Sequence, residues 1–222
     1  MSLNKQVDFE VVQMMCSRLC HDLVGTVGAI NAAIELMDDE SGGKAVDPDI
    51  LDLLSSSAGE TSRKLSFYRA AFGLGGNQTT LIEVQHVREL VEGLMGGSNS
   101  KVSFKWVADT TSSIPNVAAK LIYLITLLSF EALPRGGQIS IHVQPFPEGL
   151  GLACAAEGAG AALRDAVVAT LQENTLSSDL SSREVHAFYA KILAETAGAK
   201  IELGTGESLI NFAVLVPSSS LS

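Results

Sequence analysis

The chain has 222 residues, of which 46% are hydrophobic and six are proline, as expected for one compact domain or two small ones. Its 25 acidic and 15 basic residues give a formal net charge of -10, and the basic residues form no cluster, which argues against nucleic acid as a partner. No apolar run approaches the roughly 20 residues of a membrane-spanning helix, and the start lacks a signal-peptide pattern. We therefore expect a cytoplasmic protein that does not insert into a membrane.

The first predicted element is a long amphipathic helix from Asp8 to Asp38, which contains no proline. Its apolar residues recur at spacings of three and four, the spacing of one helix face. They are Val12, Cys16, Leu19, Leu23, Val27, Ile30, Ile34 and Met37. At about 100° per residue, His21 falls on the opposite face and is expected to face water. Gly25 and Gly28 follow on that side, one and two turns later, and would leave the ring open to an approaching protein.

The cysteines give no sign of a disulfide framework or a metal site. There are three, an odd number, which fits a reducing compartment. Cys16, Cys20 and His21 are close in sequence, but they crowd one helix, and Cys16 belongs to the apolar face whereas His21 points away. We therefore expect no zinc ion here.

A second helix is predicted from Asp47 to Phe72, because aspartate is a favoured N-cap and Pro48 is tolerated at the first helical position. A polar turn at residues 38–43 separates it from the first helix. Its apolar seam comprises Leu51, Leu54, Ala58, Thr61, Leu65, Tyr68 and Phe72. Two antiparallel helices cannot enclose a core, so we expect a homodimer in which two hairpins close a four-helix bundle.

After a glycine linker at residues 73–76, the pattern becomes mixed. The predicted helices are 83–95, 115–132, 161–172 and 181–197. The predicted strands are 101–107, 138–143, 150–155, 200–203 and 208–216, with a hairpin loop at 144–149 and a loose tail at 217–222. Helices grouped against a mostly antiparallel sheet indicate a two-layer sandwich. The predicted fold class is α+β, with a helical hairpin over residues 1–76 and an α/β sandwich over 77–222.

Four motifs carry a resemblance to a known family. They are Leu19–Gly25 (LCHDLVG), Val27–Asn31 (VGAIN), Phe67–Gly73 (FYRAAFG) and Glu131–Gly137 (EALPRGG). The order of elements is similar to the body of a two-component histidine kinase, and the motifs resemble the alphaproteobacterial histidine phosphotransferase ChpT family over residues 8–216. One departure is Thr26, where the family has proline, so a helix kink after the histidine is in question.

The resemblance implies that His21 is a phosphoacceptor that relays a phosphoryl group between receiver-domain aspartates of a hybrid histidine kinase and of response regulators. A neutral imidazole is nucleophilic, and the receiver with its Mg²⁺ would supply most of the machinery, so no cofactor of the chain's own is expected. Asp22 is expected to orient the imidazole, and Arg18, one turn earlier, to neutralise the phosphoryl group. Asn31 matches the motif but needs no role. The remaining histidines are interpreted as structural or solvated: His86, His142 and His186.

The second domain resembles a kinase ATP-binding domain in which each nucleotide element has changed. Phe130 stands where kinases have a magnesium-directing asparagine, and Glu157–Gly160 keeps the glycine spacing of an adenine-reading turn but begins with glutamate. Asp179–Glu184 replaces a glycine-rich lid whose amides would hold phosphate. We therefore expect a phosphotransfer protein without ATP-dependent kinase activity of its own. Two alternatives remain: an ATP-dependent kinase, and a non-phosphorylated adaptor that only docks partners.

Overall fold

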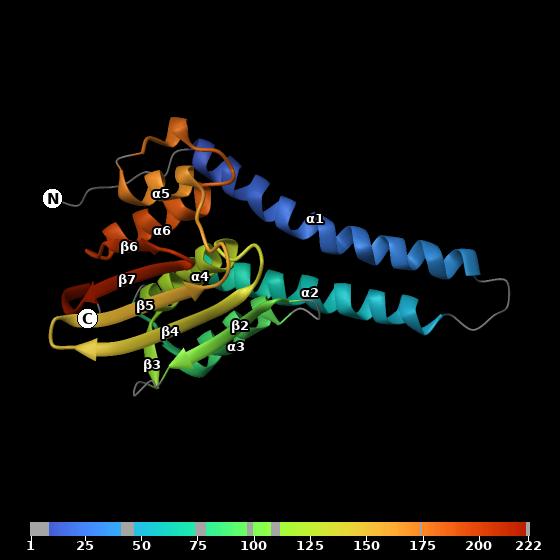
Figure 1. Cartoon of the computed structure of the whole chain (residues 1–222), viewed down its shortest axis with the longest axis horizontal. Helices are drawn as coiled ribbons and strands as arrows, with labels where there is room; N and C mark the ends of the chain where they lie inside the picture. The colour runs from blue at the N-terminus through green and yellow to red at the C-terminus, as the bar shows by residue number, and fades with distance from the viewer. Residues whose placement is uncertain are drawn as a thin grey trace.

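The computed structural model describes residues 9–40, 47–73, 79–96, 100–107, 112–173 and 175–220. Two long helices form a hairpin that projects from a mixed body of helices and one larger sheet (Figure 1). None of the helices in these ranges is both long and apolar enough to cross a membrane. The turn predicted at residues 38–43 begins too early, because residues 38–40 still belong to the first long helix. The rest of that turn and most of the glycine linker at 73–76 lie outside the described residues.

The hairpin has the two predicted helices, α1 (Phe9–Glu40) and α2 (Pro48–Phe72). Asp47 caps α2 as predicted, because its carboxylate accepts a hydrogen bond from the backbone N–H of Asp49 at 2.9 Å. α1 passes through Thr26 without a break, and the buried Thr26 hydroxyl donates to the carbonyl of Leu23 at 3.1 Å. Threonine keeps the backbone N–H that proline would remove, so the helix continues.

The body alternates short helices and strands. The helices are α3 (Val84–Met95), α4 (Asn116–Glu131), α5 (Asp165–Gln172) and α6 (Val185–Thr196), with 3-10 turns η1 (Ser177–Asp179) and η2 (Ser218–Ser220). The strands are β1 (Leu81–Glu83), β2 (Val102–Val107), β3 (Ser113–Pro115), β4 (Gly137–Phe146), β5 (Gly149–Glu157), β6 (Ile201–Gly206) and β7 (Leu209–Pro217). The larger sheet has the order β2-β4-β5-β7-β6, and only the β2–β4 pair is parallel. The predicted α+β class and the mostly antiparallel sheet are confirmed.

Two strands were missed. β1 and β3 form a small antiparallel sheet in which Glu83 pairs with Ser113. The prediction that residue 83 begins a helix was therefore wrong, as was the prediction that residue 115 does, because each residue ends a strand. Strands of three residues are too short to display an alternating pattern.

The predicted loop at residues 144–149 was also wrong, because β4 continues to Phe146 and only Pro147 and Glu148 form the turn. Pro145 is tolerated in the strand since β2 pairs with β4 only as far as His142. Beyond that point no β2 residue pairs with β4, so the proline's missing N–H costs no hydrogen bond to β2.

Two helices begin four residues later than predicted, α5 at Asp165 and α6 at Val185. Before α5, the chain turns back on the end of α4, where the Ala162 N–H donates to the Ala132 carbonyl at 3.0 Å. Before α6, residues 181–184 form a turn in which the Glu184 N–H donates to the Ser181 carbonyl at 3.2 Å. In both places these hydrogen bonds replace the first turn of a helix.

The loose tail predicted at residues 217–222 is ordered as far as the structure describes it. Ser218–Ser220 form η2, the Ser218 N–H donates to the Glu148 carbonyl at 2.9 Å, and the Ser220 hydroxyl donates to the Ala197 carbonyl at 2.8 Å. The tail is thereby fixed to the β4–β5 turn and to the end of α6.

The core is organised around α4, which is buried along nearly all its length. It packs on the sheet and on α2, α3 and α6. Burial alternates along β7, so one sheet face is covered and the other is open. Phe67 of α2 is fully buried in this same core, with its ring centroid 5.4 Å from that of Tyr123 in an edge-to-face arrangement. The base of the hairpin is thus anchored in the body, and the division at residue 76 stays a prediction.

The anchoring predicts a large effect of Phe67→Ala. Removing a fully buried ring leaves a cavity, so we expect the free energy of unfolding to fall by about 3–5 kcal/mol, measured by urea denaturation. Phe146→Ala is the matched control, since that ring is 47% exposed. Equal losses in the two variants would contradict the anchoring role.

Candidate functional site

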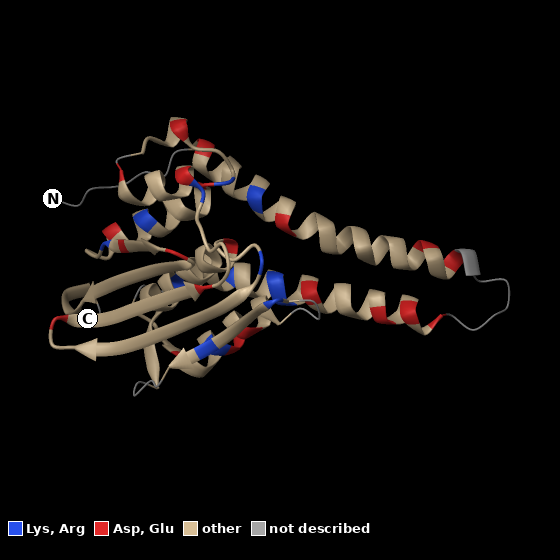
Figure 2. Ribbon diagram, in the orientation of Figure 1, with Lys and Arg blue, Asp and Glu red and all other residues tan. Residues whose placement is uncertain are grey.

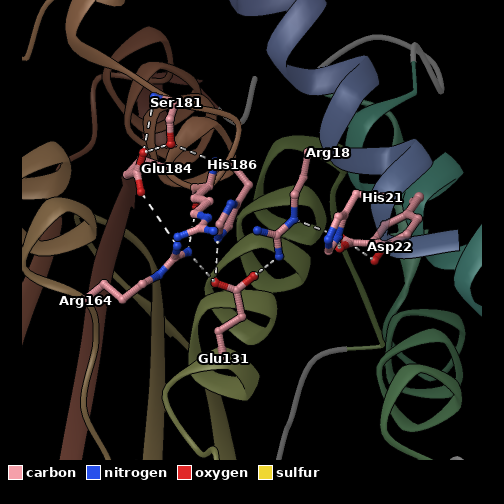
Figure 3. Close-up of polar contacts among 10 residues, drawn as sticks. Arg18, His21, Asp22, Glu131, Arg164, Ser181, Glu184 and His186 are labelled. Carbon is pink, nitrogen blue, oxygen red and sulfur yellow. Dashed lines mark hydrogen bonds and ion pairs between the residues drawn. The ribbon is translucent and has the colours of Figure 1, made fainter. Parts of the chain in front are cut away.

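His21 lies on α1 where the hairpin meets the body, and its side chain is 86% exposed, as predicted (Figure 3). Gly25 and Gly28 are also exposed, and a methyl group added at either would meet no other described part of the chain within 4 Å. The space beside the imidazole is therefore open. Asn31, further along α1, is exposed as well. The partner-binding role assigned to the two glycines stays a prediction.

The Asp22 carboxylate is shared between the imidazole and two donors. Its Oδ1 lies 3.3 Å from Nδ1 of His21, while its Oδ2 accepts hydrogen bonds from Nε of Arg18 at 2.9 Å and from the Tyr68 hydroxyl at 3.1 Å. The Asp22 side chain is only 16% exposed, so these contacts hold it in one orientation. An imidazole that donates from Nδ1 to a carboxylate keeps the lone pair of Nε2 free.

Tyr68 and Lys64 bring α2 into the site. Burial and the neighbouring Asp22 carboxylate raise the pKa of Tyr68 well above its ordinary value, so the phenol stays protonated and donates. Lys64 donates from Nζ to the Asp22 backbone carbonyl at 3.4 Å and pairs with Glu60 at 2.8 Å. The sequence placed Tyr68 in the apolar seam and in the Phe67–Gly73 motif, but it indicated no role for Tyr68 in the site. The missed signal was its hydroxyl, which needs a partner when buried.

Arg18 bridges α1 and α4. Its Nε contacts Asp22, and its Nη2 forms a close ion pair with Oε1 of Glu131, the last residue of α4 (Figure 3). Burial favours the neutral guanidinium, but the Glu131 and Asp22 carboxylates outweigh it and raise the pKa of Arg18. The structure therefore brings Arg18, His21 and Asp22 together as predicted. The role of Arg18 toward a phosphoryl group stays a prediction.

Glu131 faces the body with its second oxygen. Oε2 lies 3.2 Å from Nε2 of the fully buried His186, outside good hydrogen-bond alignment, and 3.6 Å from Nη2 of Arg164. Burial disfavours the charged carboxylate, but His186, Arg18 and Arg164 outweigh that effect and hold the pKa of Glu131 below its ordinary value. His186 is thus structural, as predicted, whereas His86 and His142 are exposed. No sequence pattern linked Glu131 to α1, because 113 residues separate it from Arg18.

Local backbone structure accounts for both glycines of residues 157–160: Gly160 has a φ of +73°, and Gly158 lies at a close backbone crossing. A methyl group on Gly158 would lie 2.4 Å from the carbonyl oxygen of Gly136, and one on Gly137 would lie 2.2 Å from that of Glu157. Real side chains never approach so closely, so glycine is required where these two segments cross. The retained spacing in Glu157–Gly160 therefore needs no nucleotide to explain it.

Glu184, the residue directly before α6, directs its carboxylate back to the preceding turn and makes no cap hydrogen bond to the helix. Glu184 accepts a hydrogen bond from the Ser181 N–H at 3.2 Å and a short one from the Ser181 hydroxyl, and it lies 3.7 Å from Nη1 of Arg164. Phe130, in the predicted asparagine position, is partly buried against the core. In the part of the chain that the structure describes, no group of three or more His, Cys, Asp or Glu side chains could hold a metal ion.

A cavity of about 400 Å³ lies between the hairpin and the body beside this site. Its polar lining comes from α1, α2 and α4 and includes Arg18, Asp22, Lys64, Tyr68 and Glu131. A second cavity, of about 610 Å³, lies over the open sheet face and shares none of these residues.

Comparisons with known proteins agree with this geometry. The family model described as the histidine phosphotransferase C-terminal domain matches residues 84–208, more than half of the chain. The protein phosphotransferase ChpT of Brucella abortus (strain 2308) is 28% identical over 198 residues, which are 89% of this chain and 91% of that protein.

Solved structures agree in fold. A bacterial phosphotransferase superposes with a TM-score of 0.80 at 25% identity, over 96% of this chain and 100% of that chain. The histidine kinase ThkA, solved in complex with the response regulator protein TrrA, shares the fold with a TM-score of 0.53 at 14% identity, over 95% of this chain and 63% of that chain. The chain therefore belongs to the histidine phosphotransferase family and has a phosphotransfer role in two-component signalling.

Proposed function

We propose that this protein relays a phosphoryl group between the aspartates of two receiver domains through His21. The observation that carries the proposal is the pairing of an 86% exposed imidazole with a fixed carboxylate at its Nδ1. Such a ring presents a free Nε2 lone pair to a partner. The partners are the receiver domains of a hybrid histidine kinase and of response regulators, and the relay operates in the cytoplasm.

The transfer conserves atoms and charge at each step. Nε2 of His21 attacks the phosphorus of a receiver acyl phosphate, an N–P bond forms, the P–O bond breaks, and the electron pair leaves with the receiver carboxylate. In the second half, the aspartate of another receiver attacks the same phosphorus, and the N–P electron pair returns to Nε2. The Mg²⁺ that neutralises charge belongs to the receiver, so this chain supplies no cofactor.

Asp22 supports the attack by stabilising the ring. When Nε2 bonds to phosphorus while Nδ1 keeps its proton, the imidazole becomes positively charged. Oδ1 of the Asp22 carboxylate, 3.3 Å from Nδ1, compensates that positive charge and fixes the tautomer. Arg18, one turn earlier, is paired with Asp22 and Glu131, and it would share its guanidinium with the phosphoryl oxygens to neutralise them.

The charge of the hairpin favours a phosphoryl group near its base. Figure 2 shows acidic residues toward the distal end, where residues 25–40 and 47–62 contain no Lys or Arg. The described Lys and Arg residues of the hairpin all lie in the other half: Arg18, Arg63, Lys64 and Arg69. A dianionic group is therefore favoured beside His21, and the receiver docks over Gly25 and Gly28.

The hairpin also presents an apolar stripe that a single chain leaves uncovered. Its members are 43–51% exposed: Val12, Val27, Ile34, Leu51 and Leu65. A second copy would cover them in a four-helix bundle and place the two His21 sites on opposite sides. The functional unit is then a homodimer.

The body is a degenerate ATPase-like domain without kinase activity. Glu184 places a carboxylate in the turn before α6, and Phe130 has no oxygen for a metal ion. The carboxylate would repel a triphosphate where a lid would supply amide donors. The domain instead holds the receiver beside His21.

The first prediction concerns His21→Ala. Incubated with a receiver carrying labelled acyl phosphate, the wild-type chain should acquire acid-labile label and pass it to a second receiver, whereas the variant should acquire none because the nucleophile is gone. His86→Ala, which removes another exposed histidine, is the control and should transfer normally. Undiminished transfer in His21→Ala would contradict the relay, and receiver binding without label in the wild type would favour the adaptor.

The second prediction concerns the apolar stripe. Ile34→Glu should convert a dimer into a monomer at micromolar concentration, because burying an unpaired carboxylate in the bundle costs several kcal/mol. Light scattering after size exclusion measures the mass. Leu81→Glu, on β1 and also exposed, should stay dimeric. A monomeric wild type would overturn the homodimer.

The third prediction is that Mg-ATP does not bind in the micromolar range. A lid without glycine amides loses hydrogen bonds to the phosphates. The loss of two such charge-assisted hydrogen bonds, of about 1.5–3 kcal/mol each, weakens Mg-ATP binding by about two to four orders of magnitude. Titration calorimetry is the direct measurement. Saturable binding at low micromolar concentration, followed by labelling of His21 from ATP, would establish the kinase alternative.

A further inference from the structure

Glu131 uses its two carboxylate oxygens in opposite directions. Oε1 contacts Nη2 of Arg18 on the hairpin, and Oε2 faces His186 and Arg164 on the body. Glu131 is the last residue of α4, the most deeply buried helix, so its backbone is held by the core. A rigid helix thus delivers one carboxylate oxygen to the side chain that contacts Asp22.

The contacts of Arg18 are unusual for arginine. Nε and Nη2 form the side of the guanidinium that usually grips both oxygens of a single carboxylate. Here that pair of donors is divided, because Nε bonds Oδ2 of Asp22 while Nη2 is paired with Glu131. Arg18 therefore occupies only one oxygen of Asp22.

The division leaves the other oxygen to the imidazole. Oδ1 of Asp22 contacts Nδ1 of His21 at 3.3 Å, whereas Oδ2 accepts from both Arg18 and Tyr68. If Glu131 did not hold Nη2, the guanidinium could rotate slightly and bond both oxygens of Asp22. His21 would then compete with a permanent cation for Oδ1, and the Nδ1–H tautomer would lose its acceptor.

We propose that Glu131 is a positioning residue for His21: by holding Nη2 of Arg18, it keeps Oδ1 of Asp22 free to orient the imidazole with Nε2 toward the incoming phosphorus. Its importance for transfer rests on the proposed function of His21 as phosphoacceptor. Glu131 itself contacts neither the imidazole nor the phosphoryl group. It acts through Arg18 and Asp22, across the boundary between body and hairpin.

The test reads the tautomer directly in the unphosphorylated protein. In ¹⁵N-histidine-labelled protein, above the ordinary histidine pKa of about 6.5, the two ring nitrogen shifts report which nitrogen carries the proton. We expect mainly Nδ1–H at His21 in the wild type and a shift toward Nε2–H in Glu131→Gln. The double variant Arg18→Gln with Glu131→Gln should return toward Nδ1–H, because the competing cation has been removed while Tyr68 still holds Oδ2.

Glu92→Gln is the matched control, because Glu92 also pairs with an arginine, Arg88 at 2.8 Å, on the surface of α3. It should leave the His21 tautomer unchanged. If Glu131 had a purely structural role, Glu131→Gln would lower thermal stability, and the His21 tautomer would not return toward Nδ1–H in the double variant. An unchanged tautomer in a folded Glu131→Gln protein, or no return in the double variant, would overturn the proposal.

Phosphotransfer provides the second readout. Glu131→Gln should lower the maximal transfer rate about ten-fold, which is the lower end of the losses seen when groups that orient a reactive side chain are removed. The receiver concentration that gives the half-maximal rate should change little. An unaltered maximal rate with a raised half-maximal concentration would indicate receiver docking and overturn the positioning role. The tautomer is measured without a receiver. Failure of the positioning role can therefore be distinguished from failure of the proposed relay through His21.

Discussion

The site depends on the position of the Arg18 guanidinium, which is partly buried between two carboxylates. Its side chain is 17% exposed and lies between the carboxylates of Asp22 and Glu131. A partly buried charge needs compensation, and removing one member of such a cluster leaves the others uncompensated at a cost of several kcal/mol. The cluster therefore fixes the base of α1 against the end of α4. This contact holds the Asp22 carboxylate beside the imidazole of His21.

The body has the layout of a kinase domain, and its internal contacts account for features that resemble nucleotide elements. Gly158 is required where its backbone crosses Gly136, and Glu184 caps the turn before α6. Meanwhile α4 contributes Phe130 to the core and Glu131 to the site. α4 thus holds α1, the helix that carries His21, through the contact of Glu131 with Arg18.

Features set by local sequence could be predicted. The three- and four-residue spacing defined α1 and α2, the Asp47 cap marked the start of α2, and the position of His21 on the helix predicted its exposure. Features set by tertiary contacts could not. β1 and β3 are three-residue strands that exist because they pair with each other.

The same limit applied to the site. Arg18, His21 and Asp22 lie within one helical turn and were found together. Glu131 comes from an element 113 residues away, and no periodicity connects it to α1. Tyr68 was assigned to the apolar seam because its ring fits there. Its contact with Asp22 depends on the position of the hydroxyl group, which is set by the packing of α2 on α1.

In the proposed relay, phosphate passes through one nitrogen of one side chain, Nε2 of His21. Phosphorus-31 NMR of ¹⁵N-histidine-labelled protein, recorded after mixing with a phosphorylated receiver, identifies the bonded nitrogen through its one-bond coupling. We expect a phosphoramidate on Nε2 of His21 that disappears when a second, unphosphorylated receiver is added. A phosphoramidate on Nδ1, on another histidine, or one that does not transfer onward would contradict it.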